Sequence, residues 1–135
     1  MTLSAADGNA ILDENFSPWV RDLGLVVEET GDLMAVLRLP WSSRLARQGG
    51  AMCGQALMAA ADTATVIAVS AARGEFVPMT TVQQSSTFQR PVVDTDVLVT
   101  ATLTKLGRTL AFAEVAMTAG GSVAAHATTV YALLG

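Results

Sequence analysis

The chain is poor in the residues from which disulfides and metal sites are built. Among its 135 residues there is one cysteine, Cys53, and one histidine, His126. A single cysteine excludes a disulfide within the chain and fits a reducing cytoplasm. One cysteine and one histidine are also too few for an ordinary metal centre. No glycine-rich phosphate loop of the Walker or Rossmann kind is present, so the sequence predicts no metal and no resident cofactor.

Charge is scarce as well. Only 15% of the residues are charged, the formal net charge is −4, and lysine and arginine form no run. This composition argues against a nucleic-acid partner and against electrostatic binding to an anionic membrane. Residues 1–10 lack the basic and apolar stretches of a signal peptide, which favours a cytoplasmic protein. With 51% hydrophobic residues, the chain is expected to cover part of its surface in a homo-oligomer.

What the sequence does contain is a series of structural patterns that fits one domain over residues 1–135. Apolar spacing and turn residues predict a short helix, two strands, a long helix and four strands in a meander. The predicted helices cover residues 6–16 and 53–72, and the predicted strands cover 25–29, 33–39, 77–88, 96–106, 110–118 and 122–133. Short turns imply an antiparallel sheet, and strands on both sides of one apolar helix imply a sheet that wraps around it. The predicted fold class is α+β, with the hotdog architecture of a long central helix in a curved antiparallel sheet.

The long helix carries an isolated charge. Between residues 48 and 72, Asp62 is the only charged residue. A membrane span is rejected, because a charge at mid-bilayer costs about 2.5–3.5 kcal/mol and no second apolar segment accompanies this one. A carboxylate buried in a core helix is costly unless it is used, so Asp62 is a candidate catalytic residue. The alternative is an ordinary surface carboxylate, or one paired with arginine.

Gly54 stands where a glycine-rich loop enters the same helix. The backbone N–H groups at a helix start have no partner in the helix, and glycine lets a ligand approach them closely. Such N–H groups can form an oxyanion hole for a thioester carbonyl. Simple loop flexibility is the alternative interpretation of this glycine.

These residues resemble the motif of a known family. Residues 50–55 read Gly-Ala-Met-Cys-Gly-Gln, and residues 61–64 read Ala-Asp-Thr-Ala. Together they resemble the PaaI-like hotdog thioesterases, whose motif is Gly-x-x-His-Gly-Gly followed by Ala-Asp-Thr-Ala on an apolar helix. Gly54 precedes Asp62 by eight residues, the spacing found in the family. Residues 80–91 and 106–112 resemble the family's strand after the helix and its next hairpin.

The resemblance implies an acyl-CoA thioesterase that needs no metal and no cofactor besides the coenzyme A of its substrate. Asp62 would be the general base or the nucleophile, and Gly54 would donate its N–H to the thioester oxygen. Thr81, from the facing subunit, would help to position the water. Arg90 and Arg108 are candidates for the phosphates of coenzyme A, or are ordinary surface charges. The active site would lie between protomers of a homodimer or of a dimer of dimers.

The chain departs from the family motif at three positions. Cys53 replaces the histidine, Gln55 replaces the second glycine, and Arg47 occupies the place of an Asn or Gln that binds the carbonyl or the water. We include Arg47, which can donate hydrogen bonds, and Gln55 among the predicted substrate-binding residues. Cys53 could itself be a nucleophile only if His126 met it in space; a small packed residue is the simpler interpretation.

Two other functions stay open at this stage. The altered motif is compatible with a non-catalytic hotdog protein that binds acyl-CoA. An enoyl-CoA hydratase or dehydratase would use a histidine near the helix start, where this chain has none.

Overall fold

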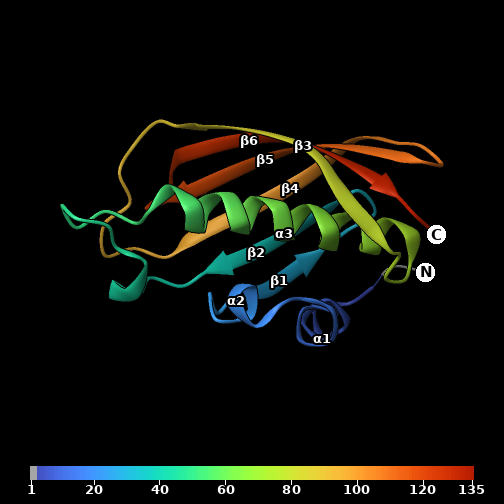
Figure 1. Ribbon diagram of the computed structural model, residues 1–135, viewed down its shortest axis with the longest axis horizontal. Helices are drawn as coiled ribbons and strands as arrows, with labels where there is room; N and C mark the ends of the chain where they lie inside the picture. The colour runs from blue at the N-terminus through green and yellow to red at the C-terminus, as the bar shows by residue number, and fades with distance from the viewer. Residues whose placement is uncertain (1–2) are drawn as a thin grey trace.

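The computed structural model describes residues 3–135 of the chain (Figure 1). It forms one six-stranded sheet, one long helix and a small helical segment before the first strand. The helices are α1 (Ala5–Asn15), α2 (Pro18–Arg21) and α3 (Gly54–Arg73), and the strands are β1 (Val26–Thr30), β2 (Met34–Leu39), β3 (Met79–Phe88), β4 (Val97–Leu106), β5 (Leu110–Ala119) and β6 (Ser122–Leu133). A single 3₁₀ turn, Ser43–Leu45, lies in the loop after β2.

The sheet has the strand order β1-β2-β4-β5-β6-β3, and every neighbouring pair is antiparallel. Figure 1 shows α3 lying across one face of this sheet, while α1 and α2 lie beside β1. The α+β class and the hotdog architecture are therefore confirmed. The core lies between α3 and the inner faces of the strands, where side chains such as Leu37, Ile67 and Val115 are fully buried.

The prediction of a four-strand meander after the long helix is wrong for β3. Only β4, β5 and β6 follow one another in the sheet, while β3 pairs with β6 at the far edge. The physical reason lies in the connections. Glycine turns at Gly107 and at 120–121 join the three meander strands, but residues 89–96 between β3 and β4 form a longer link without such a turn.

Helix α3 begins at Gly54 and ends where Gly74 adopts a left-handed conformation, with φ of 83°. Glycine is favoured there because it has no Cβ to clash in that conformation. By length and composition α3 could span a membrane, but 72% of its most apolar window is buried inside the fold. The rich alanine content thus serves close packing against the sheet. Its buried Thr65 donates to the carbonyl of Ala61 and shares a hydrogen bond with Thr129 of β6.

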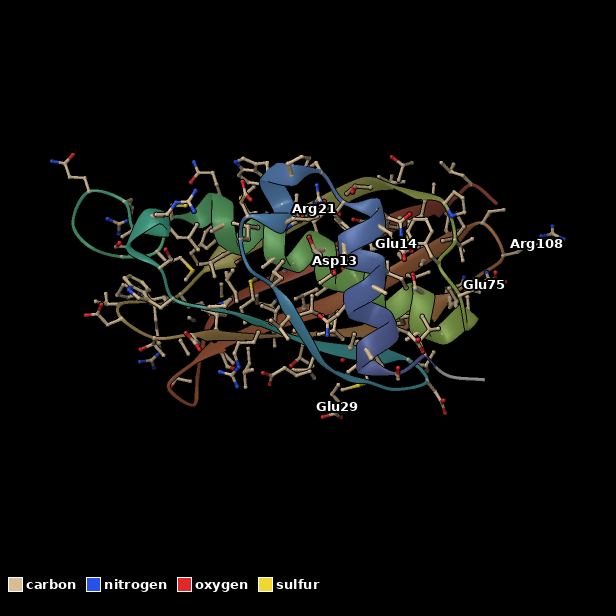
Figure 2. All side chains as sticks on the ribbon, turned by 90° about the horizontal axis from the view of Figure 1, so that it is seen from below. Asp13, Glu14, Arg21, Glu29, Glu75 and Arg108 are labelled. Carbon is tan, nitrogen blue, oxygen red and sulfur yellow. The ribbon has the colours of Figure 1, made fainter. Side chains whose placement is uncertain are left out.

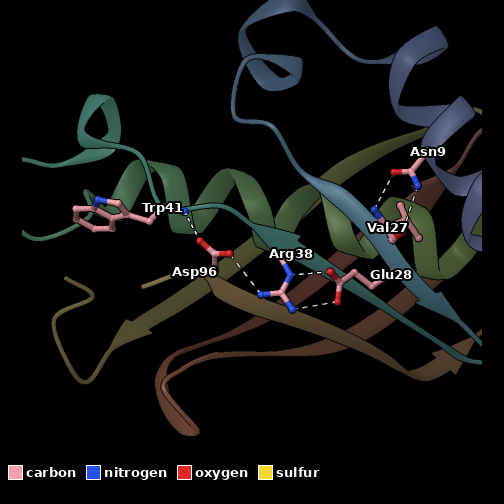
Figure 3. Close-up of polar contacts among 6 residues, drawn as sticks. All are labelled: Asn9, Val27, Glu28, Arg38, Trp41 and Asp96. Carbon is pink, nitrogen blue, oxygen red and sulfur yellow. Dashed lines mark hydrogen bonds and ion pairs between the residues drawn. The ribbon is translucent and has the colours of Figure 1, made fainter. Parts of the chain in front are cut away.

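The two edges of the sheet differ. At the β1 edge, the Asn9 side chain of α1 accepts from the backbone N–H of Val27 at 2.8 Å and donates to its carbonyl at 3.2 Å (Figure 3). Asn9 therefore occupies backbone groups that another strand could use. On β2, Arg38 holds Glu28 at 2.6 Å and Asp96 at 3.4 Å (Figure 3). Within residues 3–135, the opposite edge, β3, has a strand neighbour on one side only.

Helix α2 was missed by the sequence analysis, which ended the first helix at residue 16 and predicted no further helix before the strand at residues 25–29. The chain does leave the first helix near residue 16, but Pro18 then begins a further turn. Proline is well tolerated at the first position of a helix, since its missing N–H has no helical partner there.

Candidate functional site

Asp62 lies in the middle of α3 and is half-buried. Its carboxylate oxygen Oδ1 accepts a hydrogen bond from the Thr81 hydroxyl of β3 at 2.9 Å. The Tyr131 hydroxyl of β6 also contacts Oδ1, and it lies 3.0 Å from the backbone carbonyl oxygen of Asp62. The only carboxylate of α3 is therefore held by two hydroxyl groups from the neighbouring strands β3 and β6.

The sheet aligns these two donors. Thr81 and Tyr131 are direct partners in the register of β3 and β6, so both side chains leave the same face of the sheet. The pairing is irregular between Thr81 and Gln83, where β3 carries an extra residue. Such a bulge increases the local twist and changes where side chains point. The bulge thus lies next to the strand residue that contacts Asp62.

The Thr81 contact corrects one expectation. We predicted that Thr81 reaches the site from a facing subunit, but in this structure it binds Asp62 of its own chain. The reason is that β3 follows α3 closely in sequence and runs back along it as the edge strand next to β6. The pair of Asp62 and Thr81 is thus complete within one chain.

The second carboxylate oxygen, Oδ2, has no hydrogen-bond partner among residues 3–135. In the same part of the chain, no fully buried side-chain oxygen lacks a partner. Oδ2 is therefore reachable by solvent. Asp62 thus combines one anchored oxygen with one that can meet water or a ligand.

Tyr131 was missed by the sequence analysis. Its side chain is only 3% exposed. Burial first, and then the negative charge and hydrogen bond of Asp62, raise the pKa of the Tyr131 phenol, while a hydrogen bond with Thr81 acts in the opposite direction. The phenol therefore stays protonated and remains a donor at neutral pH. No motif surrounds Tyr131, and the one signal that could have found it is the alternation of the last strand, in which Thr129 and Tyr131 are buried.

Gly54 opens a second part of the site, a groove of about 450 Å³. The N-cap residue Cys53 makes no side-chain hydrogen bond to the helix start, which leaves the first N–H groups uncapped. A Cβ at Gly54 would stand 3.3 Å from the Phe88 ring, so glycine permits this close approach. The groove is lined by Arg47, Ala51, Met52, Gly54, Leu57, Phe88, Gln89, Arg90, Pro91 and Val92.

A smaller cleft of about 230 Å³ adjoins the Asp62 donors. Thr81 and Tyr131 form part of its wall, and most of the rest is apolar. The lining residues are Asn15, Phe16, Val66, Phe76, Met79, Thr80, Thr81 and Tyr131. An uncharged hydrocarbon group would fit this lining better than a charged one.

The predicted arginines divide into two groups. Arg47 and Arg90 both line the groove at Gly54, and Gln55 is exposed on the first turn of α3. Arg108 lies in the turn between β4 and β5, next to the far end of α3, where Arg73 donates to the Gly107 carbonyl at 2.7 Å. Figure 2 shows the Arg108 side chain extending away from the fold. Within one chain, Arg108 therefore does not join the other two arginines.

Cys53 and His126 do not form a pair. Cys53 directly precedes α3 and packs against the hydrophobic core. On β6 the neighbouring Ala127 is fully buried, so the alternation of the strand turns His126 to the outer face. Among residues 3–135, no three His, Cys, Asp or Glu side chains are grouped to hold a metal ion.

Comparison with known proteins identifies the family. A profile of the thioesterase superfamily matches residues 49–125, more than half of the chain. The chain belongs to the thioesterase superfamily. No curated protein sequence matches it significantly.

Solved structures support the same assignment. A conserved protein of Pseudomonas aeruginosa superposes with a TM-score of 0.84 at 27% identity, over 90% of this chain and 98% of the other. A variant of the phenylacetic acid degradation protein PaaI of Thermus thermophilus gives 0.78 at 25% identity, over 87% and 100%. Thioesterase superfamily member 2 of zebrafish gives 0.84 at 22% identity, over 98% and 100%, which is a likeness of fold. The resemblance to PaaI-like hotdog thioesterases is confirmed.

Proposed function

We propose that the protein hydrolyses an acyl-CoA thioester to a free acid and coenzyme A. The observation that carries this proposal is Asp62: a carboxylate on the core helix, with one oxygen anchored by Thr81 and Tyr131 and the other open to solvent. A carboxylate with a free oxygen can take a proton from water or attack a carbonyl directly.

Both routes lead to the same products. As a base, Asp62 takes a proton from water while the water oxygen bonds to the thioester carbon; the carbon–sulfur bond then breaks and the sulfur receives the proton. As a nucleophile, Asp62 bonds to the carbonyl carbon, the thiolate leaves, and water hydrolyses the anhydride. In either route negative charge develops on the carbonyl oxygen, which an uncapped N–H such as that of Gly54 stabilises.

Gly54 and Asp62 of one chain cannot serve the same carbonyl. They are eight residues apart on α3, which corresponds to about 12 Å along the helix axis. Reacting groups must approach to about 3 Å. A second copy solves this problem, because two α3 helices that lie antiparallel about a two-fold axis bring Gly54 of each opposite Asp62 of the other. The active site then forms between two protomers, as the family resemblance implies.

The surface of the chain is suited to this homodimer. In the antiparallel arrangement, the residue midway between Gly54 and Asp62 lies at the two-fold axis, and this residue is Met58. Its side chain is 43% exposed although it belongs to the core helix. The exposed side of α3 continues through Gln55 and Ala59. Beside it runs β3, an open edge that can pair with a second β3.

The two hollows suggest how an acyl-CoA would lie. The basic groove with Arg47 and Arg90 suits the phosphates of coenzyme A. The apolar cleft beside Thr81 and Tyr131 suits the acyl group. Since one structural neighbour is described as a phenylacetic acid degradation protein, aryl acyl groups belong in any substrate panel.

The decisive experiment is a panel of short, medium, long and aryl acyl-CoA thioesters, with free thiol release as the readout. We expect release by the wild type and a loss of about 100-fold or more in Asp62→Asn. If the wild type binds acyl-CoA in calorimetry but releases no thiol, the protein is an acyl-CoA binder instead. Hydration of an enoyl-CoA, followed by loss of its absorbance without thiol release, would support the hydratase alternative.

A further inference from the structure

The two oxygens of the Asp62 carboxylate have different surroundings. Thr81 and Tyr131 both contact Oδ1, while Oδ2 has no hydrogen-bond partner within residues 3–135 and is reachable by solvent. The two donors come from adjacent strands and are direct register partners. The asymmetry therefore arises from the sheet itself and not from one mobile side chain.

Two donors on one oxygen fix the orientation of the whole carboxylate. A single hydrogen bond would let the group turn about its bond to Cβ and exchange its oxygens. Donors from two directions oppose this rotation, and hydrogen bonds to a charged acceptor are about twice as strong as neutral ones. Tyr131 can hold this position well because its ring is only 3% exposed and packed in the core.

We propose that Tyr131 and Thr81 are positioning residues that hold Oδ1 of Asp62, so that Oδ2 is the oxygen that reacts with water or with the thioester carbon. This inference rests on the thioesterase function proposed above and assigns its reacting atom. It applies equally to the base and the nucleophile route, because each begins at the unshielded oxygen.

The arrangement also predicts that an amide will not replace the acid. In Asp62→Asn, two hydroxyl donors select the amide oxygen for the Oδ1 position, since that oxygen is the acceptor. The NH₂ group is then turned to the position of Oδ2. A donor that can neither take a proton nor attack a carbonyl stands where the reacting oxygen stood.

The test compares Tyr131→Phe, Thr81→Val and Thr81→Ser in steady-state thioester hydrolysis, with thermal unfolding to confirm that each variant is folded. Tyr131→Phe keeps the ring and removes the donor. We expect kcat to fall about tenfold in Tyr131→Phe and in Thr81→Val, with KM changed less than twofold, because the donors act on the reacting group and not on substrate binding. Thr81→Ser restores a hydroxyl and should recover most of what Thr81→Val loses.

A second readout follows the contact independently of catalysis. Tyr131 is the only tyrosine of the chain, so absorbance near 295 nm reports its ionisation alone. Asp62→Asn removes the negative charge beside the phenol and should move this ionisation to lower pH. If kcat is unchanged in both Tyr131→Phe and Thr81→Val while the wild type is active, the positioning role is wrong and the thioesterase proposal stands. If the wild type releases no thiol, the proposed thioesterase function is wrong, and the assignment of Oδ2 as the reacting oxygen is wrong with it.

Discussion

Tyr131 is a buried phenol in contact with the carboxylate of Asp62. Burial and the neighbouring Asp62 raise the pKa of its phenol above the usual value of 10.0. Glu114 on the neighbouring strand β5 and His126 on β6 itself lie on strand positions that face outward. The charge that Tyr131 meets is therefore that of Asp62. In the unfolded chain the phenol is neither buried nor held beside Asp62, so its pKa returns to the usual value. The ionisation of Tyr131 is therefore linked to stability.

This linkage predicts the alkaline behaviour of the fold. Because the folded pKa of Tyr131 is raised, its contribution to stability is complete below about pH 10 and is lost as pH rises further. Above that value the wild type should lose up to about 1.4 kcal/mol of unfolding free energy per pH unit relative to Tyr131→Phe. Urea unfolding of both proteins between pH 8 and pH 11 measures the difference. Parallel curves over the whole range would contradict the buried, protonated phenol.

Local sequence signals identify some of the site residues and not others. Asp62 and Gly54 could be selected from the sequence because a lone charge and a helix-entry glycine are visible locally. Tyr131 could not, because its role depends on a register partner about fifty residues earlier and on Asp62 of α3, which precedes both strands. Arg47 and Arg90 were both suggested, but their common groove became visible only with the fold.

At the scale of elements, the start of α3 is the feature with the clearest chemical consequence. Cys53 has φ of −69° and ψ of 149°, the extended backbone that a following proline requires. Proline is also tolerated at the first position of a helix. Gly54→Pro can therefore remove one N–H without breaking α3, whereas Gly54→Ala keeps the N–H and adds similar crowding against Phe88.

This pair of variants tests the oxyanion role of Gly54. We expect Gly54→Pro to lower kcat by about 100-fold, the usual cost of losing one oxyanion donor. Gly54→Ala should lose far less, since only the contact with the Phe88 ring changes and that side chain is 47% exposed. Thioester hydrolysis and circular dichroism of both variants provide the measurement. Equal losses in the two would mean that crowding, and not the N–H, explains the effect.

The order of helices and strands along the chain was easier to predict than the pairing of the strands in the sheet. Helix α3 and the strands around it follow from apolar spacing, alanine content and glycine turns, which are local signals. The pairing of β3 with β6 is a long-range choice. This pairing depends on α3 crossing the sheet before β3 begins, and the sequence of β3 contains no local signal for its partner strand. The same long-range choice brings Thr81 to Asp62.

At the scale of the whole molecule, the open β3 edge and the exposed Met58 predict where two copies meet. Placed at a two-fold axis, Met58 would contact its own copy. We expect Met58→Asp to dissociate the dimer, because two carboxylates would then face each other at the axis, and to abolish hydrolysis with it. Met58→Leu keeps an apolar side chain of similar volume and should remain dimeric. Sedimentation velocity reports the mass of each variant, and a dimeric Met58→Asp would place the interface elsewhere.

The active site that we propose between two protomers makes a stronger prediction about mixtures of inactive chains. Asp62→Asn lacks the reacting carboxylate and Gly54→Pro lacks the oxyanion donor, so each homodimer should be inactive. In a mixed dimer, one of the two sites joins an intact Gly54 from one protomer with an intact Asp62 from the other. Co-expression with random pairing should therefore restore about one quarter of the wild-type activity per protomer.

Recovery of activity distinguishes a site shared between two protomers from a site within one chain. A shared site needs only an exchange of subunits to become intact. When the two purified homodimers are mixed, they should be inactive at first, before subunits exchange. Activity should then appear as mixed dimers form. A mixture of Asp62→Asn with Asp62→Asn carrying a different affinity tag gives no intact site and serves as the control. If the exchanged dimers of Asp62→Asn and Gly54→Pro remain inactive, both groups must act within one chain. Gly54 and Asp62, about 12 Å apart along α3, would then have to contact different atoms of one substrate.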